Sequence, residues 1–121
     1  PCPCFYQFFA NEEGMLHLNM YQRSCDTFLG VPYNTAQDVL FLCMMAHVTG
    51  RKPGRFNHFF GDAHIYLNHI EQVKEQLTRE PHQLPSIRLN PDVKNILDFT
   101  WDDIELIGYE HDAGIKGAVS I

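Results

Sequence analysis

The sequence predicts an α+β fold. Residues 15–23 alternate apolar and polar side chains, which is typical of a strand with one buried face. Residues 35–49 contain a run that is apolar nearly all round, which indicates a helix buried on most sides. Residues 65–79 have apolar side chains at helical spacing. Because the chain has 121 residues and no repeat or linker, we expect one domain, residues 1–121.

The N-terminal part is predicted to form two strands joined by a turn. Phe5–Phe9 is aromatic and is followed by a turn that contains Gly14. Met15–Arg23 is the second strand. Its alternation places the side chains of Tyr21 and Arg23 on the same face.

A loop and a helix are expected next. The glycine and the proline of residues 28–33 indicate a loop. Asn34 suits the N-cap position, because its side-chain oxygen can accept a hydrogen bond from a free amide of the first turn. The helix over Thr35–Thr49 should end at Gly50 as a C-cap residue, followed by a turn at 52–54.

The remaining residues predict short strands separated by helix and loop. Their boundaries come from prolines and from changes in the apolar spacing. In order, we expect a strand at Arg55–Phe60, a helix at Ile65–Arg79, a loop at Glu80–Pro85, a strand around Ile87 and Leu89, a short helical turn from Asn90 to Leu97 and a strand at Ile104–Tyr109.

The composition is that of an ordinary globular protein and excludes several classes. The chain is 45% hydrophobic and 20% charged, with a net charge of -6. An acidic balance argues against an extended nucleic-acid-binding surface. No apolar run reaches the roughly 18 residues that a membrane span needs, and the N-terminus has no signal-peptide character. We therefore expect no nucleic acid and no membrane as a partner.

Four cysteines are too few to indicate a disulfide scaffold in a chain of this length. Cys43 lies in the apolar run and is expected in the core. Reduced thiols predict a cytoplasmic protein. A zinc site is the competing interpretation, because Cys2 and Cys4 are close in sequence and the chain has seven histidines. The ligand pairs of a zinc finger are not in their usual order, so we expect no metal.

The segment Gln22–Asn34 is the most informative stretch of the chain. It combines a cation, a hydroxyl, a carboxylate, a glycine turn and an amide. This segment resembles the phosphate- and pyrimidine-binding stretch of thymidylate synthases, while residues 1–8 resemble their nucleophile strand and residues 61–69 their sugar-binding segment. The resemblance covers essentially the whole chain. It implies the C-terminal portion of such an enzyme, with a mixed sheet packed by a buried central helix.

The resemblance implies that Cys2 is the nucleophile. Carbon 6 of uracil is an electron-poor alkene carbon to which a thiolate adds, and the addition makes carbon 5 nucleophilic toward a one-carbon electrophile. Arg23, on the facing strand, can supply a cation that favours the thiolate. The residues alone favour an inert cysteine, so this role depends on the resemblance.

The substrate-binding residues implied by the resemblance each have a structural alternative. Arg23 and Ser24 suit a 5'-phosphate, but a strand-end arginine is often only exposed. Asn34 suits the O4 and N3–H edge of uracil, or a helix cap. His64 and Tyr66 share a face of an extended stretch and suit the sugar 3'-hydroxyl, or a buried structural role. The substrate-binding set is Gln22, Arg23, Ser24, Asn34, His64 and Tyr66.

A folate site is also implied by the resemblance. Asp26 suits the N–H groups of a pterin ring, although a loop-capping carboxylate is the alternative. Residues of the predicted loop 28–33 would wall the folate, and residues 116–121 would close over it as a lid. The set is Asp26, Leu29, Gly30, Tyr33, Val119 and Ser120.

The implied reaction transfers a one-carbon unit from 5,10-methylenetetrahydrofolate to C5 of deoxyuridylate. Pro3 stands where the family usually has a histidine that organises water, so deoxyuridylate hydroxymethylation is the alternative. The N-terminal portion of the family's enzymes brings a glutamate, a tryptophan and arginines that cross the dimer. We therefore expect a homodimer that needs such a portion. Without it, the chain would be an inactive nucleotide-binding or dimerisation fragment.

Overall fold

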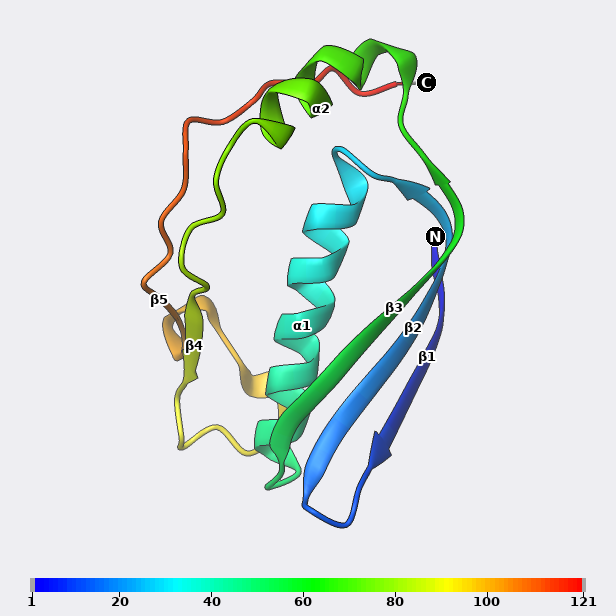
Figure 1. The fold of residues 1–121 in the computed structure, drawn as a ribbon. Coiled ribbons are helices and arrows are strands. Elements are labelled where there is room, and N and C mark those ends of the chain that lie inside the picture. The colour runs from blue at the N-terminus through cyan, green and yellow to red at the C-terminus, as the bar shows by residue number, and fades with distance from the viewer. Residues whose placement is uncertain (1, 121) are drawn as a thin grey trace.

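The computed structural model describes residues 2–120, and a three-stranded sheet with a long helix against one face forms its centre (Figure 1). The elements are β1 (Pro3–Ala10), β2 (Met15–Asp26), α1 (Gly30–Val48) and β3 (Lys52–His64), in the sheet order β1-β2-β3. β1 pairs antiparallel with β2, whereas β2 pairs parallel with β3. The predicted α+β class and the mixed sheet packed by a central helix are therefore confirmed.

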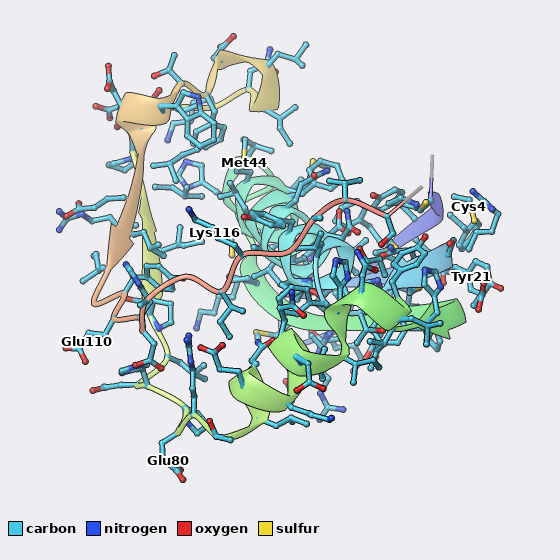
Figure 2. All side chains as sticks on the ribbon, turned by 90° about the horizontal axis from the view of Figure 1, so that it is seen from above. Cys4, Tyr21, Met44, Glu80, Glu110 and Lys116 are labelled. Carbon is cyan, nitrogen blue, oxygen red and sulfur yellow. The ribbon has the colours of Figure 1, made fainter. Side chains whose placement is uncertain are left out.

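The predicted hairpin of β1 and β2 is confirmed. Gly14 closes it with a φ of 77°, a conformation that glycine adopts without steric strain. β2 alternates as expected, because Leu16, Leu18 and Met20 are buried while the residues between them face the other side. Tyr21 lies on that other side, away from α1 (Figure 2).

The second half of the chain forms short elements on the other side of α1 (Figure 1). They are η1 (Leu67–His69), α2 (Ile70–Leu77), β4 (Ser86–Leu89), η2 (Ile96–Asp98), η3 (Trp101–Asp103) and β5 (Ile104–Ile107). β4 and β5 pair antiparallel. Residues 111–120 then return to α2 without regular secondary structure.

Helix α1 connects the two parallel strands and lies between the sheet and the β4–β5 pair (Figure 1). Asp38, Leu42 and Ala46, spaced by four residues, are its buried line. Most of its other apolar side chains are half-buried, so the helix is less enclosed than its composition predicts. Among residues 2–120, no helix is long and apolar enough to cross a membrane.

The core consists of Leu16, Leu18, Leu42 and Ala46, with Phe8, Phe41, Met45 and Phe56 packed against it.

The predicted start of the helix is wrong. α1 begins at Gly30, so residues 28–33 are not a loop throughout, and Asn34 lies one turn inside the helix. Leu29 takes the N-cap position, without a side-chain cap. Pro32 is the cause of the error. Proline has no N–H to donate, but the first N–H groups of a helix have no partner within it, so proline is tolerated there.

The predicted turn at residues 52–54 is also wrong, because β3 already begins at Lys52. The register between β2 and β3 shifts just after Leu16, as in a β-bulge. Gly54 is needed at this shift. A Cβ there would lie 2.7 Å from His17 Nδ1 and 2.8 Å from the Leu16 carbonyl oxygen.

The later elements are confirmed in type and corrected in length. The helix expected over 65–79 is η1 followed by α2, because Tyr66 is still extended, with a ψ of 145°. The turn of helix expected over 90–97 is reduced to η2 at its end. The last two predicted strands are β4 and β5.

The face of the sheet that points away from α1 is exposed and aromatic, and we call it the outer sheet face. Tyr21 is paired with Phe5 on one side and Phe59 on the other, so the three rings lie in a row. Their exposed fractions are 43%, 58% and 53%, respectively. In a neighbouring row, Asn57 Nδ2 donates to Asn19 Oδ1 at 2.8 Å.

Leu42 is 2% exposed, and its place in the core predicts what shortening its side chain does. Leu42→Ala should lower the free energy of unfolding by about 2–5 kcal/mol, because it removes apolar contacts and leaves a cavity between α1 and the sheet. Leu84→Ala, at a position that is 89% exposed, is the matched control and should change it by less than about 0.5 kcal/mol. Urea unfolding measures both. Equal effects would contradict this account of the core.

Candidate active site

The segments that carry the predicted site residues meet at one end of the sheet (Figure 1). Since β2 and β3 are parallel and α1 follows β2, the carboxyl ends of both strands and the start of α1 lie together. Asp26 and His64 are partners at the last position of the register. In sheets with helix-connected parallel strands, ligands bind outside these carboxyl ends. This end of the sheet is therefore the candidate site.

Cys2 lies at the same end because β1 runs antiparallel to β2. Its carbonyl oxygen accepts a hydrogen bond from the Arg23 backbone N–H at 2.8 Å. Its half-buried Sγ is 4.0 Å from Nη2 of Arg23. The Arg23 side chain is exposed on the same face as Tyr21, as the alternation predicts. The proposed nucleophile thus lies beside a guanidinium group.

The other cysteines are in different surroundings. Cys4 is exposed, and its Sγ donates to the Tyr21 carbonyl oxygen. Cys25 is buried and Cys43 is half-buried, and burial raises the pKa of both thiols. These two thiols are therefore neutral and inert at neutral pH. Among residues 2–120, no three His, Cys, Asp or Glu side chains are grouped in a way that could hold a metal ion.

Gln22 and Asn34 are joined by a hydrogen bond. Gln22 is 1% exposed, and its Nε2 donates to the Ser24 carbonyl oxygen at 2.9 Å and to Asn34 Oδ1 at 3.0 Å. His58 Nε2 lies 2.8 Å from Gln22 Oε1. Because Asn34 is inside α1 and bonded to β2, the structure does not support its alternative role as a helix cap.

Asp26 makes the contacts expected of a loop-capping carboxylate. Its Oδ1 accepts hydrogen bonds from the backbone N–H groups of Phe28 and Leu29, both at 3.2 Å, and this fixes the turn into α1. Gly30 lies against both Asp26 and Asn34, because a Cβ there would be 3.5 Å from Asp26 Cβ and 3.7 Å from Asn34 Oδ1. The start of α1 is therefore packed closely onto the end of β2.

His64 and Tyr66 lie on the same side at the end of β3, as predicted. Their ring centroids are 4.9 Å apart and the ring planes are nearly perpendicular. His64 Nδ1 is 3.2 Å from the Asp62 carbonyl oxygen. The His64 carbonyl accepts from the Thr27 N–H at 2.9 Å, which ties the end of β3 to the turn before α1.

The C-terminal segment, residues 113–120, lies along α2 and η1 (Figures 1 and 2). His69 is fully buried, and its Nε2 donates to the Ala118 carbonyl oxygen at 2.7 Å. Gly117 approaches the turn before α1 so closely that a Cβ would lie 2.8 Å from the Phe28 ring. The segment thus reaches the edge of the candidate site.

The two predicted folate contacts on this segment differ from each other. Ser120 Oγ donates to Asn68 Oδ1 at 2.6 Å, so it is joined to η1. Val119 is 82% exposed. Tyr33, on the first turn of α1, is also mostly exposed. Ile121, the last residue of the predicted lid, lies outside the described residues.

Two polar residues behind the site, one half-buried and one buried, were not predicted from the sequence. One is His58, which contacts Gln22. The other is Asp38, which is 2% exposed and accepts a hydrogen bond from Tyr6 at 3.1 Å through Oδ1. Its buried Oδ2 has no hydrogen-bond partner within the described part of the chain. The signal was a polar residue in an otherwise apolar stretch, which identifies a site only when the pairing of the elements is known.

Asp38 adjoins an open, mainly apolar cleft of about 640 Å³ between β1 and α1. Burial raises the pKa of the Asp38 carboxyl, although the Tyr6 hydrogen bond and nearby His58 oppose the shift. The other residues that line the cleft are Tyr6, Phe8, Gln37, Leu40, Phe41 and Met44.

A family model described as thymidylate synthase matches residues 1–121. The chain therefore belongs to the thymidylate synthase family, and the resemblance inferred from its motifs is confirmed. The two segments that carry most of that resemblance, Gln22–Asn34 and Gly61–His69, are neighbours in the structure through the pairing of β2 with β3.

The raised pKa of Asp38 predicts a pH-dependent stability. The folded protein holds this proton more tightly than the unfolded chain does, whose carboxyl titrates near pH 4. The free energy of unfolding should therefore fall as the pH rises from about 4 through the folded pKa. In Asp38→Asn, this decrease of the free energy of unfolding with rising pH should disappear. The opposite contribution of His58, whose pKa is lowered by burial, should remain. Urea unfolding between pH 4 and pH 7 measures the difference, and parallel curves for the two proteins would refute the assignment.

Proposed function

We propose that this member of the thymidylate synthase family transfers a one-carbon unit from 5,10-methylenetetrahydrofolate to C5 of deoxyuridylate. The observation that carries the proposal is the 4.0 Å distance between Cys2 Sγ and the Arg23 guanidinium. It occurs at the end of the sheet where Asn34, His64 and Tyr66 also lie. Family membership supplies the reaction class, and this geometry supports Cys2 as a reactive nucleophile.

Cys2 acts as the nucleophile in this proposal. Its thiolate adds to C6 of uracil, so the S–C6 bond forms and the C5–C6 π electrons move toward C5 and O4 as an enolate. C5 then attacks the one-carbon electrophile. Loss of the C5 proton breaks the bond between the one-carbon unit and the folate nitrogen, and the hydride that the folate supplies reduces this unit to a methyl group. Elimination of the thiolate then restores the C5–C6 double bond and releases Cys2. The guanidinium of Arg23 stabilises the thiolate by its charge.

The substrate is held by residues from three elements. Arg23 and Ser24 bind the 5'-phosphate through a guanidinium fork and a hydroxyl. Asn34 binds the base, since its Oδ1 already accepts from Gln22 and its Nδ2 can donate to O4. Gln22 contributes by orienting Asn34, and the sugar 3'-hydroxyl bonds to the side chains of the last residue of β3 and of Tyr66 just after it. The proposed substrate set is Gln22, Arg23, Ser24, Asn34, His64 and Tyr66.

The start of α1 has features that suit a folate. When bound, methylenetetrahydrofolate supplies the one-carbon unit and the hydride. Two backbone N–H groups use Oδ1 of Asp26, which leaves Oδ2 to accept from the N–H groups of a pterin ring. Gly30 has no side chain between Asp26 and Asn34, and Tyr33 offers an exposed ring. The proposed folate set is Asp26, Leu29, Gly30, Tyr33, Val119 and Ser120.

We further propose that residues 1–121 are a C-terminal catalytic portion that works as a homodimer with an N-terminal portion of the same enzyme. The support for a dimer is the outer sheet face, where the rings of Phe5, Tyr21 and Phe59 are about half exposed in one row. Contiguous exposed apolar surface on a protein usually marks an interaction site. Covering this face with its own copy would bury these rings.

Hydroxymethylation of deoxyuridylate is the second candidate. Pro3 follows the nucleophile, and the pyrrolidine ring has no donor or acceptor with which to order water near the base. Water would then capture the one-carbon unit in place of a hydride. Analysis of the product separates the two reactions, since one gives a 5-methyl and the other a 5-hydroxymethyl nucleotide.

The assignment of Cys2 predicts a covalent adduct. With the folate and an N-terminal portion of the enzyme present, 5-fluorodeoxyuridylate should trap Cys2, because fluorine at C5 blocks the proton loss that precedes elimination. Mass spectrometry of the N-terminal peptide identifies the modified residue. Cys2→Ser should abolish the adduct, whereas Cys4→Ser should leave it intact. An adduct on Cys4 would refute the assignment, and nucleotide binding without any adduct would favour an inactive binding fragment.

The assignment of Arg23 predicts a selective loss of affinity. Arg23→Ala should weaken deoxyuridylate binding at least about tenfold, because charge-assisted hydrogen bonds contribute about 1.5–3 kcal/mol each. Binding of the uncharged nucleoside should change little. Alkylation of Cys2 by a neutral reagent at neutral pH should become slower, because the neighbouring positive charge is lost.

Two further variants complete this test, with calorimetry as the measurement of affinity. Arg23→Lys should recover only part of the affinity, because an ammonium cannot copy the guanidinium fork. Arg55→Ala removes an exposed arginine of β3 as the matched control and should have no effect. Equal losses for nucleotide and nucleoside in Arg23→Ala would mean that Arg23 has only a structural role.

A further inference from the structure

We propose that His58 is a positioning residue that fixes the orientation of the Asn34 side-chain amide and, through it, the preference for uracil over cytosine. The part about the base rests on the proposed function. The part about the amide rests on contacts within the protein alone.

The contacts form a chain of hydrogen bonds from β3 to α1 through β2. His58 Nε2 is 2.8 Å from Gln22 Oε1, and His58 Nδ1 is 3.3 Å from the hydroxyl of Thr35. Gln22 Nε2 is 3.0 Å from Asn34 Oδ1 and 2.9 Å from the Ser24 carbonyl oxygen. Gln22 is 1% exposed, so water does not compete for these groups.

The donor and acceptor chemistry of these groups fixes the direction of every hydrogen bond in the series. A backbone carbonyl only accepts, so the side of the Gln22 amide that faces Ser24 is its NH₂ group. Gln22 Oε1 therefore faces His58, and the hydrogen on the ring must be on Nε2. Nδ1 of His58 is then the acceptor for the Thr35 hydroxyl. Each group in the series Thr35, His58, Gln22 and Asn34 donates to the next.

The Asn34 amide, the last group in this series of hydrogen bonds, has a defined donor side toward the candidate site. Because Asn34 Oδ1 accepts from Gln22, the donor hydrogens of Asn34 Nδ2 remain for a ligand. A donor at that position suits the O4 carbonyl of uracil and opposes the 4-amino group of cytosine. Replacing the His58 donor would leave Gln22 Oε1 buried and unpaired, which is unfavourable and releases Gln22 to reorient.

The surroundings of His58 keep its ring neutral and fixed in place. Burial lowers the pKa of His58, and the charge of Asp38 only partly offsets this effect. A neutral ring has one donor and one acceptor, as the chain requires. Phe56 and Phe60 lie beside the ring, at centroid distances of 5.4 Å and 4.3 Å. A phenylalanine at position 58 would therefore keep the apolar packing while removing the donor.

The experiment compares the wild-type protein with His58→Phe and His58→Gln. Calorimetry measures the affinities for deoxyuridylate, deoxycytidylate and deoxyuridine, and NMR measures the side-chain amide resonances of Asn34 and Gln22 in the ligand-free protein. His58→Phe should lower the preference for deoxyuridylate over deoxycytidylate about tenfold, the effect of about one hydrogen bond to a buried partner. Its preference for deoxyuridylate over deoxyuridine should not change, because the phosphate contacts remain.

His58→Gln restores a donor near the same position and should retain the base preference within about threefold. His111→Phe removes an exposed histidine whose ring lies beside Tyr109 and the Asp112 carbonyl oxygen, and it is the matched control. Thermal unfolding confirms that each variant is folded. In the ligand-free protein, the Asn34 and Gln22 amide resonances should move in His58→Phe and stay near their wild-type positions in His111→Phe.

The outcomes separate this inference from the proposed function. Unmoved amide resonances in folded His58→Phe, or an unchanged base preference, would overturn the role of His58. If the resonances move but the wild-type protein binds no pyrimidine nucleotide, the proposed function fails while the positioning of Asn34 stands.

Discussion

The parallel pairing of β2 with β3 is the constraint on which the rest of the structure depends. Two parallel strands cannot be joined by a tight turn, so the chain between them must cross back over the sheet. Helix α1 makes this crossing and covers the inner face. The same geometry places the end of β2, the end of β3 and the start of α1 at one end of the sheet, where Asp26 is paired with His64. The core and the candidate site are thus consequences of one connection.

The interface between α1 and the sheet changes character along its length. At the far end it is apolar, where Leu16 and Leu18 pack on Leu42 and Ala46. Toward the candidate site it becomes polar, and Gln22 bonds to both Asn34 and His58. Buried polar groups destabilise a fold unless they are paired, so such a network is most readily accommodated next to a well-packed core. The apolar end stabilises the contact between helix and sheet, and the polar end orients side chains at the site.

The sequence predicted the parts of the fold that are set by local patterns. The alternation over residues 15–23 gave the second strand and its buried face, and the apolar run beyond Asn34 gave the long helix. The start of α1 was missed because Pro32 is compatible with both a loop and a first helical turn. His58 and Asp38 were missed for a different reason. Their roles depend on which residues face one another across β2, β3 and α1, and a single sequence does not contain that register.

The candidate site has a rigid part and a weakly held part. The rigid part is bonded through the backbone, from the sheet pairing of Asp26 and His64 to the hydrogen bond between Thr27 and the His64 carbonyl. Residues 111–120 have no regular secondary structure, and the hydrogen bonds that hold them to α2 and η1 come from side chains such as His69. A segment held in this way can open at a lower free energy than the sheet can. This difference is what the proposed folate lid requires, because such a lid must release product while the residues proposed to orient the pyrimidine stay in place.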